Sequence, residues 1–340
     1  MGFVLFSLSM IINAGILRRI FDLVKDRGAY TDDQKKFLSD TLVSDSELVP
    51  ATVAHEIFGP VIGTVDWSTI GLEVGASLEP LDLGLLGYYL HSCPDLLSAY
   101  EKLVRYQALI SDVANFHVEE DEEHIYWYLT TPMGFGFMDD RMMKVVTDLG
   151  MACRHGIVKR LAQSGLSPAF VELVYNDDDP DNLKALEKFY GCKAIYGQNF
   201  NKIIYRKSDV ERPIPSSNAE VRRLLEPVLN QRMEKLYGNK NQTQMVERLI
   251  RSNIGLMNCT LESIAFKLNM SPRNLQRRLQ NEDAKFQDLL EQIQKEVSLS
   301  CKQNGMVPKE IADLLGYKET NSFLRAFKRW YGVSFSKYTG

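Results

Sequence analysis

The sequence predicts an α+β domain at residues 1–211, a linker that contains a helix at 212–240, and an all-α domain at 241–340 made of two helix-turn-helix units joined by a linker helix. Three observations favour this fold class. The chain of 340 residues is longer than one ordinary domain. Its first part mixes helical spacing with short alternating stretches, whereas everything after Gln242 repeats the pattern helix, short turn, helix. Between the two parts, RPIPSSN at 212–218 has the proline and serine content of a linker.

The first part contains both helical and strand patterns. Residues 1–60 have mostly helical spacing with a polar interruption at TDDQKK. Residues 116–130 alternate and are rich in aromatic side chains, which predicts a hairpin with the acidic EEDEE at its turn. Further helices are predicted at about 94–110, 139–164, 183–190 and 219–237, and further strands at about 169–175 and, as a pair, 194–205.

The charge of the chain is unevenly distributed. Residues 241–340 contain 15 Lys and Arg against 10 Asp and Glu, a balance of +5. The whole chain has 40 against 44, so the first 240 residues carry 25 against 34, a balance of −9. An acidic body with a basic tail indicates that only the tail binds a polyanion.

The cysteines indicate a reducing compartment. They are odd in number, scattered and without CxxC spacing: Cys93, Cys153, Cys192, Cys259 and Cys301. This pattern argues against a disulfide framework and a zinc site, so we expect a cytoplasmic protein. Cys93 precedes Pro94 at a predicted helix start, where a thiolate would be stabilised, and a redox-sensing role is therefore an alternative.

The chain begins with an apolar stretch, MGFVLFSLSMIINAGI. No basic residue precedes it, it contains Ser7, Ser9 and Asn13, and it is short for a membrane span. Apolar residues continue at helical spacing to Val24, which predicts one amphipathic helix buried against its own domain. A membrane-tethered protein is the alternative interpretation.

The tail contains an internal repeat. The first copy is IAFKLNMSPRNLQRRL at 264–279, and the second is IADLLGYKETNSFLRAF at 311–327. In each copy a small alanine allows two helices to cross closely, and the turn residue, Asn269 or Gly316, is of a type that tolerates positive φ. Ser271 followed by Pro272 has the pattern of an N-cap and a first helical residue. Each copy is therefore predicted to be a helix-turn-helix unit, whose second helix enters the major groove of DNA.

A projection of the two second helices at about 100° per residue separates a core face from an outward face. With Leu275 and Phe323 directed to the core, the outward residues are Arg273, Gln276, Arg277 and Gln280, with Asn274 at the edge, in the first helix, and Asn321, Arg325, Lys328 and Arg329 in the second. Such side chains hydrogen-bond guanine and adenine edges. An ordinary solvated face would also contain Asp and Glu, and both of these faces exclude them.

A helix is predicted between the two copies, at 286–301. At about 1.5 Å per residue it is about 24 Å long. It is suited to hold the two second helices about one DNA turn, near 34 Å, apart on one side of a duplex.

At this point residues 240–339 resemble the AraC/XylS family of transcription regulators, on the motifs SPRNLQRRL and IADLLGYKETNSFLRAFKRWYGVSFSKY. The resemblance implies double-stranded DNA and RNA polymerase as partners, a homodimer, no cofactor and no enzymatic activity. The base-contacting positions that it implies are Arg273, Gln276, Arg277, Thr320, Asn321, Ser322 and Arg325. The phosphate-contacting positions that we expect are Ser271, Asn274, Arg278, Lys328 and Arg329.

The chain departs from the family pattern at two positions in this region. Phe335 stands where the family usually has proline, and Gln294 stands where the linker helix usually has arginine. Neither departure falls on a predicted DNA-reading helix. The second is expected to loosen the relative orientation of the two units or to remove a backbone contact.

The first two hundred residues are similar to the effector-binding domain of the ornithine-regulator-like branch, which is of the arabinose-binding type. The similarity is carried by residues 71–112 and 173–215. It implies control by a small-molecule effector, for which an apolar molecule such as a fatty acid is the family-level expectation. Tyr126 and Tyr128 are weak candidates for lining its cavity. The alternative is a membrane-tethered or redox-sensing regulator with the same tail.

Two other constellations are weaker. The acidic run DDDPD at 177–181 lacks the loop length and terminal Glu of an EF-hand, so a solvated loop is the better interpretation. His117 and His124 flank the predicted hairpin turn and are at most a weak metal pair. No nucleophile elbow, phosphate-binding loop or paired-carboxylate spacing is present in the sequence, which predicts no catalytic site.

Overall fold

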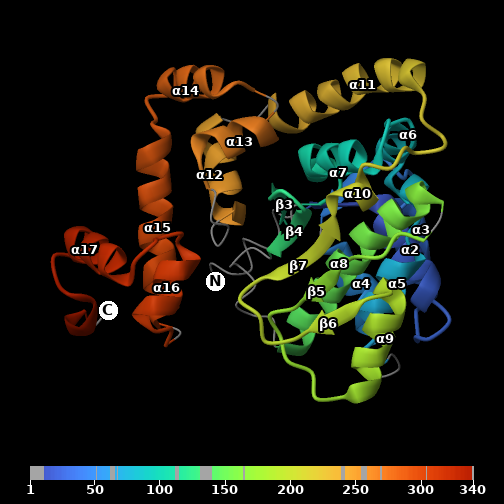
Figure 1. Cartoon of the computed structure of the whole chain (residues 1–340), viewed down its shortest axis with the longest axis horizontal. Helices are drawn as coiled ribbons and strands as arrows, with labels where there is room; N and C mark the ends of the chain where they lie inside the picture. The colour runs from blue at the N-terminus through green and yellow to red at the C-terminus, as the bar shows by residue number, and fades with distance from the viewer. Residues whose placement is uncertain are drawn as a thin grey trace. The chain divides into compact units, whose positions relative to one another are not determined.

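The computed structural model describes residues 11–50, 52–61, 66, 68–111, 115–130, 140–163, 165–238, 242–253, 259–268, 270–303 and 305–338 (Figure 1). The chain divides into two compact units, Met1–Arg232 and Met233–Gly340. The boundary falls inside helix α11 (Ala219–Gly238), which is the charged helix that the sequence predicts. The α+β character of the first unit and the all-helical character of the described part of the second confirm the predicted fold class.

The N-terminal unit contains a five-stranded sheet in the order β3-β4-β7-β5-β6. Its strands are β3 (Asn115–Glu120), β4 (His124–Thr130), β5 (Phe170–Glu172), β6 (Lys193–Ile195) and β7 (Asn201–Arg206). The predicted hairpin is confirmed, because β3 pairs antiparallel with β4. The predicted strand pair at 194–205 is wrong in its pairing. β6 instead pairs parallel with β5, which lies between β6 and β7, because helix α9 (Pro180–Tyr190) carries the chain from β5 to β6.

The alternation along β4 decides which side chains enter the core. Ile125, Trp127 and Leu129 are buried, whereas Tyr126 and Tyr128 on the opposite face are half-buried. Helices α7 (Leu96–Arg105) and α8 (Asp140–Ala162) pack on the sheet, α7 against β3 and α8 against β4 and β7. The core therefore lies between these two helices and the inner face of the sheet.

The prediction that residues 1–60 are mostly helical is wrong in part. Strand β1 (Ile11–Asn13) pairs with β2 (Leu48–Pro50), because residues far apart in sequence satisfy each other's backbone groups. The TDDQKK segment does not interrupt a helix but begins one. Thr31 accepts a hydrogen bond from the Gln34 N–H and caps α3 (Asp32–Thr41). The amphipathic helix predicted near the start is α2 (Ala14–Val24), and residues 1–10 lie outside the described part of the chain.

The close packing of α8 against helix α5 (Ile70–Ser77) depends on glycine. A Cβ added at Gly71 would lie 2.4 Å from the Val145 carbonyl oxygen, and one added at Gly75 would lie 2.5 Å from the Ala152 Cβ. Both distances are too short for a real side chain, so the two backbones approach each other only because these positions lack one.

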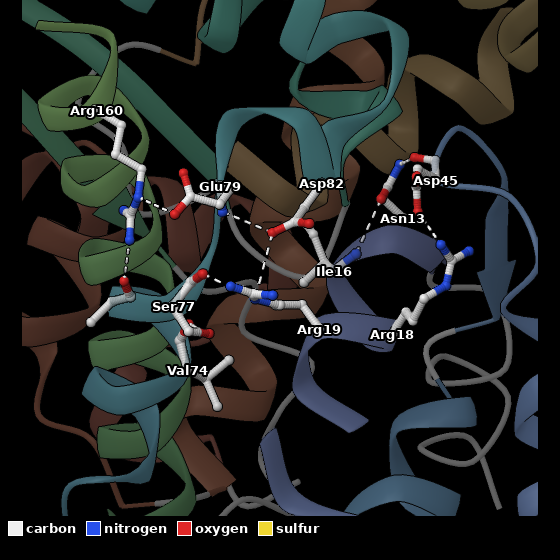
Figure 2. A network of polar contacts seen from close by, with 11 residues as sticks. Asn13, Ile16, Arg18, Arg19, Asp45, Val74, Ser77, Glu79, Asp82 and Arg160 are labelled. Atoms are coloured by element: carbon white, nitrogen blue, oxygen red, sulfur yellow. Dashed lines mark hydrogen bonds and ion pairs between the residues drawn. The ribbon is translucent and has the colours of Figure 1, made fainter. Parts of the chain in front are cut away.

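A polar network joins α2, α8 and the short helix η2 (Pro80–Leu83) (Figure 2). The Arg160 Nε donates to Glu79 Oε1 at 2.7 Å, and the Glu79 N–H donates to Asp82 Oδ2 at 2.7 Å. The Arg19 Nε donates to the Ser77 carbonyl at 3.0 Å. These contacts fix the segment between α5 and α6 (Leu85–His91) on the surface of the first unit.

The described part of the C-terminal unit is helical. Its elements are α12 (Gln242–Asn253), α13 (Leu261–Lys267), α14 (Pro272–Gln280), α15 (Phe286–Gln303), α16 (Pro308–Leu314), α17 (Thr320–Tyr331) and the short η4 (Phe335–Lys337). α13 packs on α14, and α16 on α17. These two helix pairs lie at opposite ends of α15 (Figure 1). The remaining short elements of the chain are α4 (Val53–Phe58), η1 (Gly59–Val61), η3 (Gln107–Leu109) and α10 (Lys207–Val210).

Candidate nucleic-acid interface

The two helix pairs turn in the same way. The Met270 N–H donates to the Ala265 carbonyl at 2.9 Å, and the Tyr317 N–H donates to the Ala312 carbonyl at the same distance. Both alanines are fully buried, as a close helix crossing requires. Gly316 has φ +78°, the left-handed conformation that the sequence predicts at this turn. The corresponding residue of the first pair, Asn269, lies outside the described residues.

The second helices begin differently. Ser271 Oγ accepts the Asn274 N–H at 3.2 Å and Pro272 is the first residue of α14, so the predicted N-cap is confirmed. The N-cap of α17 is Glu319, and its side chain makes no capping hydrogen bond. α17 instead packs its Phe323 and Phe327 rings against Phe335.

The exposure of the second helices agrees with the projection. Leu275 and Phe323 are fully buried. The predicted outward residues that are exposed are Arg273, Gln276, Arg277, Gln280, Asn321, Arg325, Lys328 and Arg329, and Arg278 is also exposed. Asn274, Thr320 and Ser322 are half-buried. α14 and α17 contain no Asp or Glu, so each unit presents a polar face without negative charge.

A pair of equivalent arginines is supported in the same way in both helices. The Arg277 Nη2 donates to Asn274 Oδ1 at 3.2 Å, and the Arg325 Nη2 donates to Ser322 Oγ at 3.2 Å. Each contact links residues three apart along the helix, which are neighbours on its surface. Each guanidinium is thereby restrained on the exposed face, with other N–H groups left to donate.

Two of the predicted phosphate-contacting arginines have intramolecular partners. The Arg278 Nη1 donates to Gln242 Oε1 at 3.5 Å. The Arg329 Nη2 lies 2.5 Å from Glu291 Oε1 on α15, and this bond holds the pKa of Glu291 below its usual range. The Trp330 Nε1 also donates to Glu291, at 2.6 Å. Arg329 of α17 is thus paired with α15.

An aromatic cluster supports α17. The ring of Phe327 lies 4.9 Å from Phe335, 4.6 Å from Tyr331 and 5.7 Å from Tyr338, measured between centroids. The Lys302 Nζ lies 4.6 Å from the Phe335 ring centroid. Phe335, which stands where the family usually has proline, therefore packs in the aromatic cluster of the second helix-turn-helix.

The second departure, Gln294, also makes a contact. Its Nε2 donates to the Leu315 carbonyl at 3.1 Å, which satisfies a backbone group at the end of α16. The Gln294 amide thus connects α15 to the turn between α16 and α17. α15 itself has 18 residues, two more than the sixteen expected, and is about 27 Å long at 1.5 Å per residue.

Sequence reasoning missed one contact that joins α12 to the turn after α14 in the C-terminal unit. Glu282, in the turn after α14, accepts the N–H groups of Gln242 and Thr243 at 2.8 and 2.7 Å and so caps α12. Forty residues separate the partners along the chain, and a local capping pattern gives no signal for such a pair.

The alternatives based on Cys93 and on the apolar start gain no support. Cys93 is buried, and burial raises the pKa of its thiol to about 11, so the helix start does not stabilise a thiolate as expected. Among the residues that the structure describes, no helix is long and apolar enough to span a membrane.

The weaker constellations have ordinary structural roles. Asp179 caps α9 by accepting the Asp181 N–H at 2.9 Å, and Asp177 lies 3.5 Å from the Lys144 Nζ. In the strand register His117 lies opposite Tyr128 and His124 opposite Arg206, which places the two histidines apart. Within the described ranges no group of three or more His, Cys, Asp and Glu is placed to hold a metal ion.

The weak effector candidates lie outside the core. The Tyr126 hydroxyl donates to Asp121 Oδ2 at 2.6 Å, and the Tyr128 ring stacks on His117 with 4.5 Å between centroids. Both lie on the face of the sheet opposite Ile125, Trp127 and Leu129.

Two helix-turn-helix units on one helix, α15, each with an exposed second helix that carries cationic and amide side chains and no carboxylate, define a DNA-binding protein. The family model described as "Helix-turn-helix domain" matches residues 264–340. The family model described as "Arabinose-binding domain of AraC transcription regulator, N-term" matches residues 37–214, which is more than half of the chain. The chain therefore belongs to the AraC family of transcription regulators.

Two curated regulators and one solved structure are similar to most of this chain. An uncharacterized HTH-type transcriptional regulator of Mycobacterium tuberculosis is 26% identical over 285 residues, covering 81% of this chain and 79% of the relative. The ornithine utilization regulator of Pseudomonas aeruginosa is 24% identical over 271 residues, covering 79% and 78%. The crystal structure of the transcriptional regulator CdpR from Pseudomonas aeruginosa superposes with a TM-score of 0.47 and 16% identity, covering 90% of this chain and 96% of that one.

Proposed function

We propose that this regulator reads two successive major-groove segments of one operator with α14 and α17. In this proposal Arg273, Gln276 and Arg277 contact bases of the first segment, and Thr320, Asn321, Ser322 and Arg325 contact bases of the second. Ser271, Asn274, Arg278, Lys328 and Arg329 contact phosphates and supply affinity that depends on salt. The observation that carries the proposal is the pair of exposed faces without carboxylates, each with an arginine restrained by a neighbour three residues earlier.

The restraint on Arg277 and Arg325 matters because an arginine reads guanine through two parallel hydrogen bonds. A guanidinium that is already held in place loses less conformational freedom on binding. A bidentate arginine–guanine contact contributes about 1–3 kcal/mol of discrimination against the wrong base. Two such contacts, one at each end of α15, would define the outer limits of the operator.

The experiment begins by selecting duplexes from a random library with the wild-type protein. Fluorescence anisotropy then compares the selected duplex with a scrambled duplex. We expect Arg277→Ala to reduce the preference for the selected duplex by about 5–150-fold, which corresponds to 1–3 kcal/mol. The matched control is Arg251→Ala on α12, whose side chain pairs with Glu296 away from the second helices. An unaltered preference in Arg277→Ala would refute the assigned role.

The proposal also includes control by a small molecule. The match to an arabinose-binding domain supports a ligand in the N-terminal unit, which would shift an existing equilibrium of dimerisation or of DNA-binding posture. RNA polymerase and a second copy of the chain are the further partners that we propose, in the cytoplasm. A ligand that changes operator affinity must, by linkage, bind more tightly or more weakly in the presence of operator, which calorimetry measures.

A further inference from the structure

The interior of the N-terminal unit contains a cationic side chain that has no carboxylate partner among the residues that the structure describes. Arg154, on the inner side of α8, is only 5% exposed. Its Nη1 donates a weak hydrogen bond to Cys153 Sγ at 4.0 Å, and its Nε has no hydrogen-bond partner among the described residues. Burial of an ion without a partner costs several kcal/mol, so buried charges in proteins are normally paired.

The acidic group nearest along α8 does not serve as this partner. Asp148 is buried, but its carboxylate is engaged by the Lys144 Nζ at 2.8 Å and by the Tyr175 hydroxyl. The neighbouring His155 is neutral, because burial lowers its pKa to about 3. Within the described residues, neither Asp148 nor His155 therefore supplies a counter-charge for Arg154.

An aromatic ring lies against the guanidinium of Arg154. The Arg154 Cζ lies 3.9 Å from the Phe116 ring centroid, so the planar cation stacks on β3. A guanidinium that is stacked by its face keeps its N–H groups at its edge, where a carboxylate binds through two parallel hydrogen bonds. Arg154 thus has the geometry of an anion-binding group in an apolar setting.

Two more buried donors lie on α7 and β4, and both of these elements pack against α8. The rings of Tyr100 on α7 and Trp127 on β4 stack at 3.4 Å between centroids. The Tyr100 hydroxyl and the Trp127 Nε1 are both buried and without a hydrogen-bond partner in the described structure. Burial raises the pKa of Tyr100, and the positive charge of Arg154 partly opposes this effect. Buried polar atoms without partners are rare, and several on elements that pack together favour a ligand-binding site.

We propose that Arg154 binds the carboxylate of an organic acid inside the N-terminal unit, between α7, α8, β3 and β4. Tyr100 and Trp127 donate the accompanying hydrogen bonds, and the Phe116, Tyr100 and Trp127 rings contact the apolar body of the acid. The inference gives a chemical class to the effector and so rests on the proposed small-molecule control. Binding itself is measured without DNA, so the two proposals can fail separately.

The first experiment compares organic acids with their neutral amides on the full-length protein. The probes are benzoate, phenylacetate and octanoate, each against the amide of the same shape. We expect at least one acid to raise the temperature of the first unfolding transition by on the order of 5 °C, because a ligand that binds only the folded state stabilises it. Its amide should have little effect. If no acid exceeds its amide, the proposal is wrong and the buried donors are hydrated by water only.

The second experiment uses variants whose expected effects have opposite signs. Arg154→Met should raise the unfolding temperature without ligand, because it removes an unpaired buried charge, and should abolish the shift produced by the acid. Arg160→Met is the matched control on the same helix, since Arg160 pairs with Glu79 at 2.7 Å. It should keep the shift. A structural role for Arg154 would instead lower the unfolding temperature of Arg154→Met.

A milder variant keeps the test decisive if Arg154→Met does not fold. Tyr100→Phe removes one unpartnered hydroxyl and keeps the ring stacked on Trp127. We expect its stability without ligand to be unchanged or higher and its affinity for the acid to fall several-fold, on the order of 5-fold for one hydrogen bond. Equal affinity of wild type and Tyr100→Phe, measured by titration of tryptophan fluorescence, would contradict the assigned contact.

Discussion

The two helix-turn-helix units share a backbone design and differ in what holds the second helix in place. In both, a buried alanine accepts a hydrogen bond from the residue five positions later, and an arginine is supported three residues along the helix. α14 has nine residues and starts with a serine cap. α17 has twelve residues and no side-chain cap, but it packs its Phe323 and Phe327 against Phe335.

This difference indicates two ways of fixing the same recognition element. The start of α14 is determined by two adjacent residues, Ser271 and Pro272, whose effect is local. The position of α17 depends on an aromatic cluster and on the contact of Arg329 with Glu291 of the linker helix. The stability of the second helix-turn-helix should therefore be more sensitive to loss of packing, and that of the first helix-turn-helix to loss of its cap.

The largest expected effect concerns the aromatic core. Phe327→Ala should lower the free energy of unfolding of the C-terminal unit by about 3–5 kcal/mol, because the fully buried ring would leave a cavity. Leu279→Ala, at the equivalent position of the first helix-turn-helix, should lower the free energy of unfolding by less, toward the lower end of about 2–5 kcal/mol. Urea unfolding followed by circular dichroism measures both. Equal costs would contradict the proposed difference between the units.

The next effect concerns base discrimination. Arg325→Ala and Arg277→Ala should each reduce discrimination by about 1–3 kcal/mol, but in different halves of the operator. Binding to duplexes with single base substitutions shows which half has lost its preference in each variant. Loss of preference in the same half for both variants would mean that the two units do not read successive segments.

The cap of α14 has a smaller expected effect. Ser271→Ala should destabilise the C-terminal unit by about 1 kcal/mol, because the Asn274 N–H loses its acceptor. Glu319→Ala, at the start of α17, removes no capping bond and should change stability by less than about 0.5 kcal/mol. A comparison of their unfolding midpoints tests the claim, and it fails if Glu319→Ala is the more harmful substitution.

The smallest expected effect concerns the contact between α17 and the linker helix. The hydrogen bond from Arg329 holds the pKa of Glu291 below its ordinary value of 4.5. A carboxyl whose pKa is lowered by folding stabilises the folded state above its unfolded pKa, and this contribution is lost as the pH falls through the folded pKa. Because both side chains are more than a third exposed, the gain should be less than about 1 kcal/mol. Glu291→Gln should therefore be slightly less stable than wild type at neutral pH, and the difference should shrink in acid.

Much of the DNA-binding tail could be predicted from local pattern. The faces of α14 and α17, the cap at Ser271 and the positive φ at Gly316 each depend on residues within a turn or two of one another, and the structure agrees with them. The hairpin at 115–130 was predictable for the same reason. Pairings over longer distances were not, and β6 and the β1–β2 pair were the errors.

The sequence by itself determined the repeat, the two helix-turn-helix units and the family, because helical period and turn chemistry are properties of neighbouring residues. The tertiary structure alone decided that Arg329 is tied to α15 and that Glu282 caps α12. It also decided that Arg154 is buried with no carboxylate partner in the described part of the chain, because burial and ion pairing depend on which distant segments fold against a residue. An arginine in a helical pattern looks the same in sequence whether it faces solvent, a partner side chain or the interior of its domain.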